Sequence, residues 1–196
     1  MKRGRFIVIE GIDGAGKTSV AKALASRLNE LGIPCIYTYE PNSPELIEFL
    51  NKAGPKAGPI FETLLIAADR YYHLESVVKP AMRQGKYVVS DRYVYSSIAY
   101  QGAQGVPRDW IVSVNRFALE PDIALYLDVP AEVGYARKRH SDTRIPYLES
   151  SKEFLERVRL EYLRLVNRGE LMLIDATKPF EDVVRECLDK VLKLAD

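Results

Sequence analysis

The sequence predicts a three-layer α/β protein, in which helices cover both faces of a five-stranded parallel sheet. Two observations predict this fold class. Five short apolar runs alternate with helical segments, and the first run leads into a glycine-rich loop that opens a helix. A chain of 196 residues is long enough for one well-buried domain and too short for two ordinary ones. We therefore expect residues 1–196 to form a single domain.

The apolar runs are rich in β-branched or aromatic residues, as buried parallel strands are. They lie at residues 6–9, 35–39, 87–90, 123–127 and 171–174. Helices are expected at residues 17–31, 44–52, 60–83, 151–168 and 179–194. The alternation of the two kinds of element implies crossover connections and hence a parallel sheet.

Glycine and proline mark the expected ends and bends of these helices. Gly32 and Pro34 end the first helix, residues 54–59 separate the second from the third, and Pro80 is expected to bend the third. Residues 137–151 are charged and polar without a core periodicity. They predict a surface loop that forms a short lid on the domain.

Composition and charge exclude several classes of function. The 28 basic residues nearly balance the 27 acidic ones, so no global charge attracts nucleic acid or anionic lipid. No apolar run is as long as a membrane helix, and the N-terminus lacks the apolar core of a signal peptide. Two cysteines and two histidines are too few for a disulfide framework or a four-cysteine zinc site. We expect two buried thiols and a cytoplasmic protein without a nucleic-acid or membrane partner.

Residues 11–18 match the phosphate-binding pattern G-x-x-x-x-G-K-[ST], between an expected strand and an expected helix. Glycines let successive backbone N–H groups point toward an anion, and the helix N-terminus adds positive potential. The lysine is expected to reach the terminal phosphates, and the threonine hydroxyl to ligate Mg²⁺. The expected phosphate site comprises Gly11, Ile12, Asp13, Gly14, Ala15, Gly16, Lys17, Thr18 and Ser19.

A phosphate loop occurs in GTPases, ATP-driven motors and small-molecule kinases. A switch GTPase would also need an N/T-K-x-D motif that reads guanine. Thr177 and Lys178 are followed by Pro179 and Phe180, so the required aspartate is absent. No D-x-x-G occurs after residue 16 either. The sequence therefore disfavours a switch GTPase.

Asp91 and Arg92 follow an expected strand, at the sheet edge where ligands of open α/β sheets gather. Asp91 is expected to bind Mg²⁺ beside Thr18, directly or through water. Arg92 is expected to bridge the donor and acceptor phosphates and to neutralise charge as the phosphoryl group moves. The alternative reading is a simple surface ion pair between Asp91 and Arg92.

Four ordered motifs, together with the phosphate loop, resemble thymidylate kinase, a P-loop nucleoside monophosphate kinase family, over nearly the whole chain. They are Leu64–Arg70, Asp91-Arg92-Tyr93 with Ser96-Ser97, Ala99–Gly102, and Ile174–Pro179. The resemblance implies transfer of the ATP γ-phosphoryl group to dTMP in dTTP biosynthesis, giving dTDP and ADP with Mg²⁺. It also implies a homodimer.

The resemblance also implies roles for individual residues. Asp13 would contact the deoxyribose 3′-hydroxyl, Arg70 a thymine carbonyl, and Tyr100 would crowd the 2′ position against ribonucleotides. Ser97 and Gln101 would read the remaining base edge. The full dTMP set is Asp13, Glu40, Ile66, Arg70, Arg92, Ser97, Tyr100 and Gln101, and the adenine side is Ala176, Thr177 and Lys178.

The family places an arginine that stabilises the transferring phosphoryl group either in the phosphate loop or in the lid. Position 14 is glycine here, so the resemblance implies a lid arginine. The candidates are Arg137, Lys138, Arg139 and Arg144, of which Arg144 best fits the family position. The expected catalytic residues are thus Lys17, Arg92 and Arg144.

Two positions depart from the family pattern. Ile66 stands where an aromatic residue often stacks on thymine, so discrimination against uracil is expected to be softer. No arginine occurs between Arg27 and Arg70, and Lys52 or Lys56 is a candidate substitute on the acceptor phosphate. The alternatives are a kinase for another monophosphate or related small molecule, and a regulatory nucleotide-binding module that hydrolyses slowly.

Overall fold

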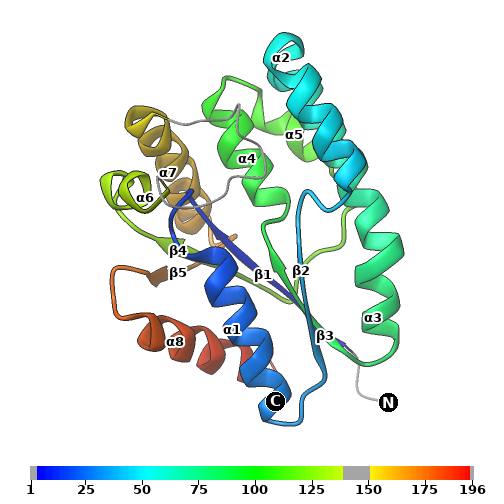
Figure 1. Ribbon diagram of the computed structural model, residues 1–196, viewed down its shortest axis with the longest axis vertical. Helices are drawn as coiled ribbons and strands as arrows, with labels where there is room; N and C mark the ends of the chain where they lie inside the picture. Colours follow the sequence, from blue (N-terminus) through cyan, green and yellow to red (C-terminus); the bar gives the residue numbers. More distant parts are fainter. Residues whose placement is uncertain (1–3, 139–150, 195–196) are drawn as a thin grey trace.

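The computed structural model describes residues 4–138 and 151–194. All strands of its five-stranded sheet are parallel, in the order β2-β3-β1-β4-β5 (Figure 1). The strands are β1 (Phe6–Gly11), β2 (Cys35–Tyr39), β3 (Tyr87–Asp91), β4 (Ile123–Asp128) and β5 (Met172–Asp175). The predicted fold class is confirmed, and each strand lies within a residue or two of its expected range.

The helices cover the sheet on both faces. In chain order they are α1 (Lys17–Glu30), α2 (Pro44–His73), α3 (Lys79–Arg83), α4 (Val94–Ala103), α5 (Arg108–Val114), α6 (Ala131–Lys138), α7 (Lys152–Asn167) and α8 (Phe180–Leu192). Helices α1 and α8 pack together in front of the sheet, whereas α3, α4 and α7 contact other parts of it (Figure 1). Within the described residues, no helix is both long and apolar enough to span a membrane.

The core is centred on β1, all six residues of which are buried. This central strand pairs with β3 on one side and β4 on the other, with Ile9 opposite Asp91 and Gly11 opposite Leu127. Because all strands are parallel, their carboxyl ends meet at one edge of the sheet. The phosphate loop, the Asp91–Arg92 turn and the segment after β5 therefore share that edge.

The expected end of a helix at residue 52 is wrong, whereas the break expected within residues 54–59 is confirmed at Gly58. Helix α2 continues through Gly54 and Pro55, and the one residue that leaves helical geometry is Gly58, with φ 78° and ψ −179°. Leu50 and Gly54 are buried, so tertiary packing holds this segment helical against its low intrinsic propensity. Only glycine adopts the Gly58 backbone without strain.

Three further expectations are corrected. The distortion expected at Pro80 lies before it, in a π-helical turn, Leu74–Val78. Arg137 and Lys138, expected in the lid, lie in the last turn of α6. Helices α4, α5 and α6 were not predicted from the sequence, although α4 carries much of the site.

Both cysteines are buried free thiols, as expected. Burial raises the pKa of Cys35 and of Cys187 to about 12. The thiols therefore behave as small apolar core residues.

Candidate active site

The phosphate loop connects β1 to α1 through residues in left-handed backbone conformations. Gly16 (φ 91°) directly precedes α1, so the first amides of that helix face the loop. The Lys17 ammonium is buried and donates a 2.8 Å hydrogen bond to the Ile12 carbonyl. Burial lowers the pKa of Lys17 to about 8, and the positive charge of Arg92 acts in the same direction. Lys17 is thus a cation whose charge favours a nearby anion.

Gly14 of the loop packs directly on the backbone of α6. A Cβ atom at Gly14 would lie 2.0 Å from the Gly134 carbonyl oxygen, and one at Gly134 would lie 2.6 Å from the Asp13 carbonyl oxygen. Gly14 also has φ 77°, which L side chains rarely adopt. No side chain fits at position 14 while α6 stays in place, and this gives a steric reason for the glycine there.

Thr18 and Asp91 meet at the carboxyl ends of β1 and β3, as the sequence analysis expected. The Thr18 hydroxyl donates to Asp91 Oδ2 at 2.5 Å. A hydroxyl and one carboxylate are hard oxygen ligands of the kind Mg²⁺ accepts, together with phosphate oxygens and water. Among the described residues, no three or more His, Cys, Asp or Glu side chains cluster as a metal cage. The donor set therefore fits a metal held jointly with a nucleotide.

Arg92 connects the two halves of the site. It is the one described non-glycine residue with a positive φ, 76°, a strained conformation of the kind that occurs at functional sites. Its guanidinium pairs with Asp13 of the phosphate loop and lies 4.9 Å from the centre of the Tyr100 ring. Because Arg92 pairs with Asp13 and not with Asp91, the simple Asp91–Arg92 ion pair is not the arrangement observed.

Arg70 is almost completely buried, with 1% of its surface exposed. Its Nε donates to Glu40 at 2.8 Å, Nη1 to Asn115 at 2.6 Å and Nη2 to Ser97 at 3.2 Å. Its guanidinium also lies 5.3 Å from the centre of the Tyr93 ring. A planar, fully held guanidinium is well suited to recognise a planar polar edge.

Glu40 is held from a second side by a histidine. His73 Nδ1 lies 3.2 Å from Glu40 Oε1, and His73 Nε2 lies 2.7 Å from the Thr38 hydroxyl oxygen. Asp69, one residue before Arg70, accepts hydrogen bonds from the Asn42 and Ser43 amides at 2.7 Å each. The loop after β2 is therefore fastened to α2 beside the arginine.

The remaining predicted residues vary in exposure. Tyr100 and Gln101 are buried on α4, and Ile66 is half-buried on α2, one turn before Arg70. Ser19, Lys52 and Lys56 are exposed. Arg139 and Arg144 lie outside the described residues.

The expected adenine side follows β5. Ala176 is buried, and its amide donates to the Asp128 carbonyl at 2.9 Å. Thr177 donates through both its amide and its hydroxyl to Asp175, and the exposed Lys178 pairs with Glu186. This ordered turn lies at the same sheet edge as the phosphate loop.

Three residues that support the site were not predicted from the sequence: Glu10, Asp69 and Asn115. Glu10 had a detectable signal, an acidic residue at the end of an otherwise apolar strand. Asn115 had none, because it meets Arg70 across 45 residues of chain.

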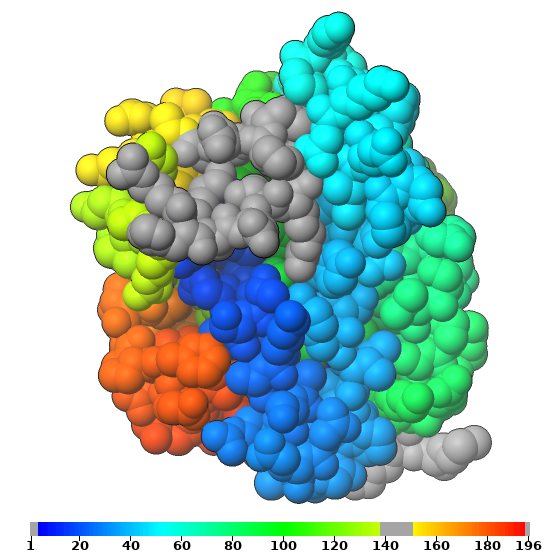
Figure 2. Space-filling model, in the orientation of Figure 1, coloured from blue at the N-terminus to red at the C-terminus, as the bar shows by residue number. Residues whose placement is uncertain are grey.

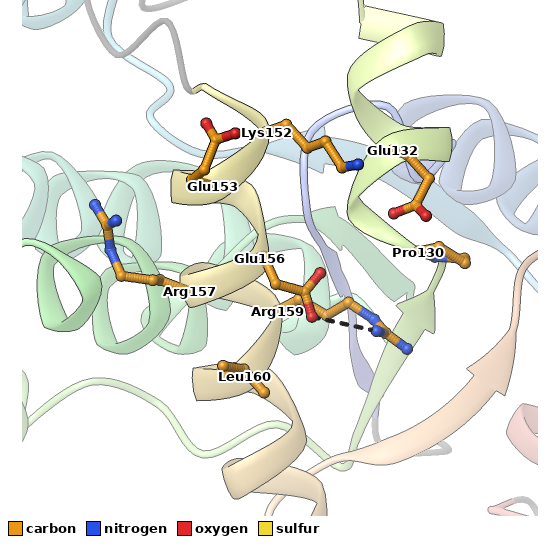
Figure 3. A pocket seen from close by; sticks show the side chains of 8 residues that line it. All are labelled: Pro130, Glu132, Lys152, Glu153, Glu156, Arg157, Arg159 and Leu160. Carbon is orange, nitrogen blue, oxygen red and sulfur yellow. Dashed lines mark ion pairs between the residues drawn. The ribbon is translucent and has the colours of Figure 1, made fainter.

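A hollow also lies between α6 and α7 (Figure 3). Its lining mixes both charges, with Glu156 and Arg159 paired at 3.6 Å. The lining residues are Pro130, Glu132, Lys152, Glu153, Glu156, Arg157, Arg159 and Leu160. None of them is a predicted site residue, so we do not assign this hollow to the active site.

Comparison with known proteins agrees with the geometry. The family model for thymidylate kinase matches residues 9–187. A probable thymidylate kinase of Staphylothermus marinus is 44% identical over 191 residues, covering 97% of this chain and 96% of the relative. A probable thymidylate kinase of Thermococcus gammatolerans is 38% identical, with 96% of each chain covered. A thymidylate kinase of Lacticaseibacillus casei is 40% identical, covering 97% of this chain and 96% of the relative.

Proposed function

The chain belongs to the thymidylate kinase family, and from this premise and the site we infer that it transfers the γ-phosphoryl group of ATP to dTMP. The products are dTDP and ADP, and the reaction serves dTTP synthesis. The observation that carries this inference is that Arg92 pairs with Asp13 of the phosphate loop and lies over the Tyr100 ring of α4, the helix that also brings Ser97 to Arg70. A protein that only binds and hydrolyses one nucleotide has no need of a second cluster of buried polar side chains such as the one around Arg70.

The chain's residues act by positioning and electrostatics. We propose that the loop amides and Lys17 bind the β- and γ-phosphates, and that Thr18 and Asp91 hold Mg²⁺. When bound, Mg²⁺ neutralises phosphate charge and orients the phosphate oxygens. The 2.5 Å contact between Thr18 and Asp91 supports this assignment.

On the acceptor side, we propose that Arg70 binds a thymine carbonyl with Glu40 as its buried counterion. Ser97 and Gln101 contact the remaining polar edge of the base. Ile66 covers a face of the base, and Tyr100 limits the space at the 2′ position. Their burial on α2 and α4 supports a pocket that excludes water. Asp13 contacts the 3′-hydroxyl, and its pairing with Arg92 keeps it beside the acceptor.

Arg144 is proposed from the sequence as the arginine that stabilises the transferring group. The steric block at Gly14 supports this proposal, because it keeps an arginine out of that loop position. We expect Arg144→Ala to lower kcat far more than it weakens nucleotide binding. A loss below about tenfold would remove Arg144 from the mechanism, since such an arginine contributes about 10³ to 10⁵ in rate.

We also propose a cytoplasmic homodimer. Six of the twelve large, exposed hydrophobic residues described lie on α2, on α5 or just after α5: Phe49, Ile60, Leu64, Tyr72, Val112 and Phe117. Helix α2 stands at the rim of the molecule, where a second copy can reach it (Figure 2). Light scattering should give twice the chain mass, and Leu64→Glu should give the monomer. The two free thiols support a reducing compartment.

The function is tested by ADP production from Mg-ATP with dTMP, dUMP, dCMP, dGMP or no acceptor. We expect strong turnover with dTMP and little without an acceptor. Comparable rates with dUMP would assign relaxed base selectivity to Ile66. Absence of acceptor-dependent turnover would contradict the proposed function.

A further inference from the structure

A buried acid lies directly beneath the phosphate loop. Glu10 is the residue of β1 that precedes Gly11, and none of its surface is exposed. Its Oε1 accepts hydrogen bonds from the backbone amides of Tyr93 at 2.8 Å and Ser96 at 3.1 Å. Its Oε2 accepts from the Ser96 hydroxyl at 2.6 Å and the Tyr162 hydroxyl at 2.8 Å. An ionised carboxylate satisfies all of these donors at once.

One of these donors also contacts Arg92. Arg92 Nη1 donates to Ser96 Oγ at 3.2 Å. Because the Ser96 proton is directed toward Glu10, the Ser96 oxygen offers a lone pair to the guanidinium. Arg92 is thus held directly by Asp13 and, through Ser96, by Glu10. The negative charge of Glu10 reaches the arginine in a buried setting, where electrostatic interactions are strong.

Glu10 also fixes the backbone on which Arg92 is mounted. Tyr93 is the N-cap residue of α4, and Ser96 lies in its first turn. The Tyr93 amide donates to Glu10, and the Ser96 amide is shared between Glu10 and the Tyr93 carbonyl, which is 3.0 Å away. By accepting both, Glu10 ties the end of β1 to the residue that follows the strained Arg92. The base of the phosphate loop and the Arg92 turn therefore share one anchor.

We propose that Glu10 is a positioning residue, which acts on phosphoryl transfer by orienting the Ser96 hydroxyl as an acceptor for Arg92. The proposal rests on the proposed kinase function. Glu10 itself does not touch the substrates. Burial raises the pKa of Glu10, while the hydrogen bonds from Ser96 and Tyr162 and the charge of Arg92 oppose that rise.

The decisive variant is Glu10→Gln, which keeps the shape of the side chain. The amide oxygen must face the two backbone N–H groups, so its NH₂ group faces Ser96 and Tyr162. The Ser96 oxygen then accepts from the amide as well as from Arg92, and the Ser96 proton turns toward the Tyr162 hydroxyl oxygen, which is 3.0 Å away. We expect a weaker contact to Arg92 and a kcat about 10- to 100-fold lower, with KM for ATP changed little.

A double-mutant cycle separates this role from simple stabilisation. Ser96→Ala alone should lower kcat by a similar factor. In the Ser96→Ala background, Glu10→Gln should cost less than about threefold in kcat, because the contact it acts through is already lost. If the kcat losses of the two single variants multiply in the double variant, Glu10 and Ser96 act independently, and the proposal is overturned. Tyr126→Phe is the matched control: it removes a buried hydroxyl from the ring stacked on Tyr162 without touching Glu10.

A second readout does not require turnover. Hydrogen exchange of the Arg92 guanidinium protons, followed by NMR and assigned with Arg92→Lys, should be faster in Glu10→Gln than in the wild type. Unchanged exchange would overturn the proposal.

If the wild type lacks acceptor-dependent turnover, the proposed function fails, while this measurement still tests the contact between Glu10, Ser96 and Arg92. If Glu10→Gln does not fold, the proposal is tested on Ser96→Ala by the exchange of the Arg92 guanidinium protons and by kcat. Wild-type values of both in that variant would overturn the proposal.

Discussion

The donor side and the acceptor side of this site are built in different ways. The phosphate loop is a continuous segment, residues 11–19, and its function depends mainly on backbone amides and glycine conformations. The proposed acceptor side is assembled from the loop after β2, from α2 and α4 and from the end of α5, and it contains a buried guanidinium with its counterion. A site made of backbone amides can be encoded in a short contiguous motif. A site made of a buried charge requires partner side chains that are distant in the sequence.

Arg92 belongs to both sides, so its loss should have the largest effect. We expect Arg92→Ala to lower kcat by about 10³ to 10⁵, because charge on the transferring phosphoryl group is then unbalanced. Arg92→Lys should recover only part of this loss, since the ammonium lacks the planar fork. Steady-state kinetics give the measurement. Arg27→Ala removes a surface arginine on α1 and should keep kcat within about twofold; an equal loss there would contradict the assignment.

The acceptor side should respond to the loss of a buried charge. Glu40→Ala leaves Arg70 buried without its counterion, and we expect a loss of about 3–5 kcal/mol in the free energy of unfolding. KM for dTMP should rise as well. Denaturant unfolding measures the first effect and steady-state kinetics the second.

A paired replacement sharpens this test. Glu40→Leu with Arg70→Met removes both charges, so most of the lost stability should return while dTMP binding does not. If the double variant is as unstable as Glu40→Ala, the ion pair is not the cause of the instability.

The phosphate loop should instead be sensitive to the addition of a single methyl group at Gly14. Gly14→Ala places a Cβ against the Gly134 carbonyl oxygen, so the loop or α6 must move. We expect kcat/KM for ATP to fall about 10²-fold. Gly32→Ala is the matched control, because Gly32 has a similar φ of 76° and open space around it. It should lose about 1–2 kcal/mol of stability through backbone strain and no activity. Equal kinetic losses would mean that strain alone, and not the contact with α6, is responsible.

The smallest expected effect is a pH dependence on the donor side. The pKa of Lys17 is lowered to about 8, so the ammonium loses its proton as the pH rises through that value. The neutral amine no longer attracts phosphate, so kcat/KM for ATP should fall above about pH 8, by up to tenfold per unit. The kcat/KM for dTMP at saturating ATP should not show this decrease above pH 8, because the phosphates of bound ATP keep Lys17 charged. A profile for ATP that stays flat to about pH 10 would contradict the lowered pKa.

The same contrast explains what could be predicted from the sequence. The five strands and the phosphate loop were predictable, because short apolar runs and a contiguous motif carry local information. The passage of α2 through Gly54 and Pro55 was not, because packing there overrides propensity. Of the partners of Arg70, Glu40 and Ser97 were expected in the dTMP set through the family resemblance, whereas Asn115 was not expected. Asn115 is 45 residues away in sequence and carries no pattern that marks it.

The burial of both thiols has a practical consequence for handling this protein. With a pKa of about 12, each thiol is ionised to only about one part in 10⁵ at neutral pH, and the thiolate is the reactive form. Native protein should therefore keep for long periods without added reductant. A single cysteine introduced at an exposed position outside the proposed dimer surface, such as Leu31, could be labelled selectively with a maleimide dye, while Cys35 and Cys187 stay in place. Fluorescence studies of substrate binding would then need no cysteine-free background.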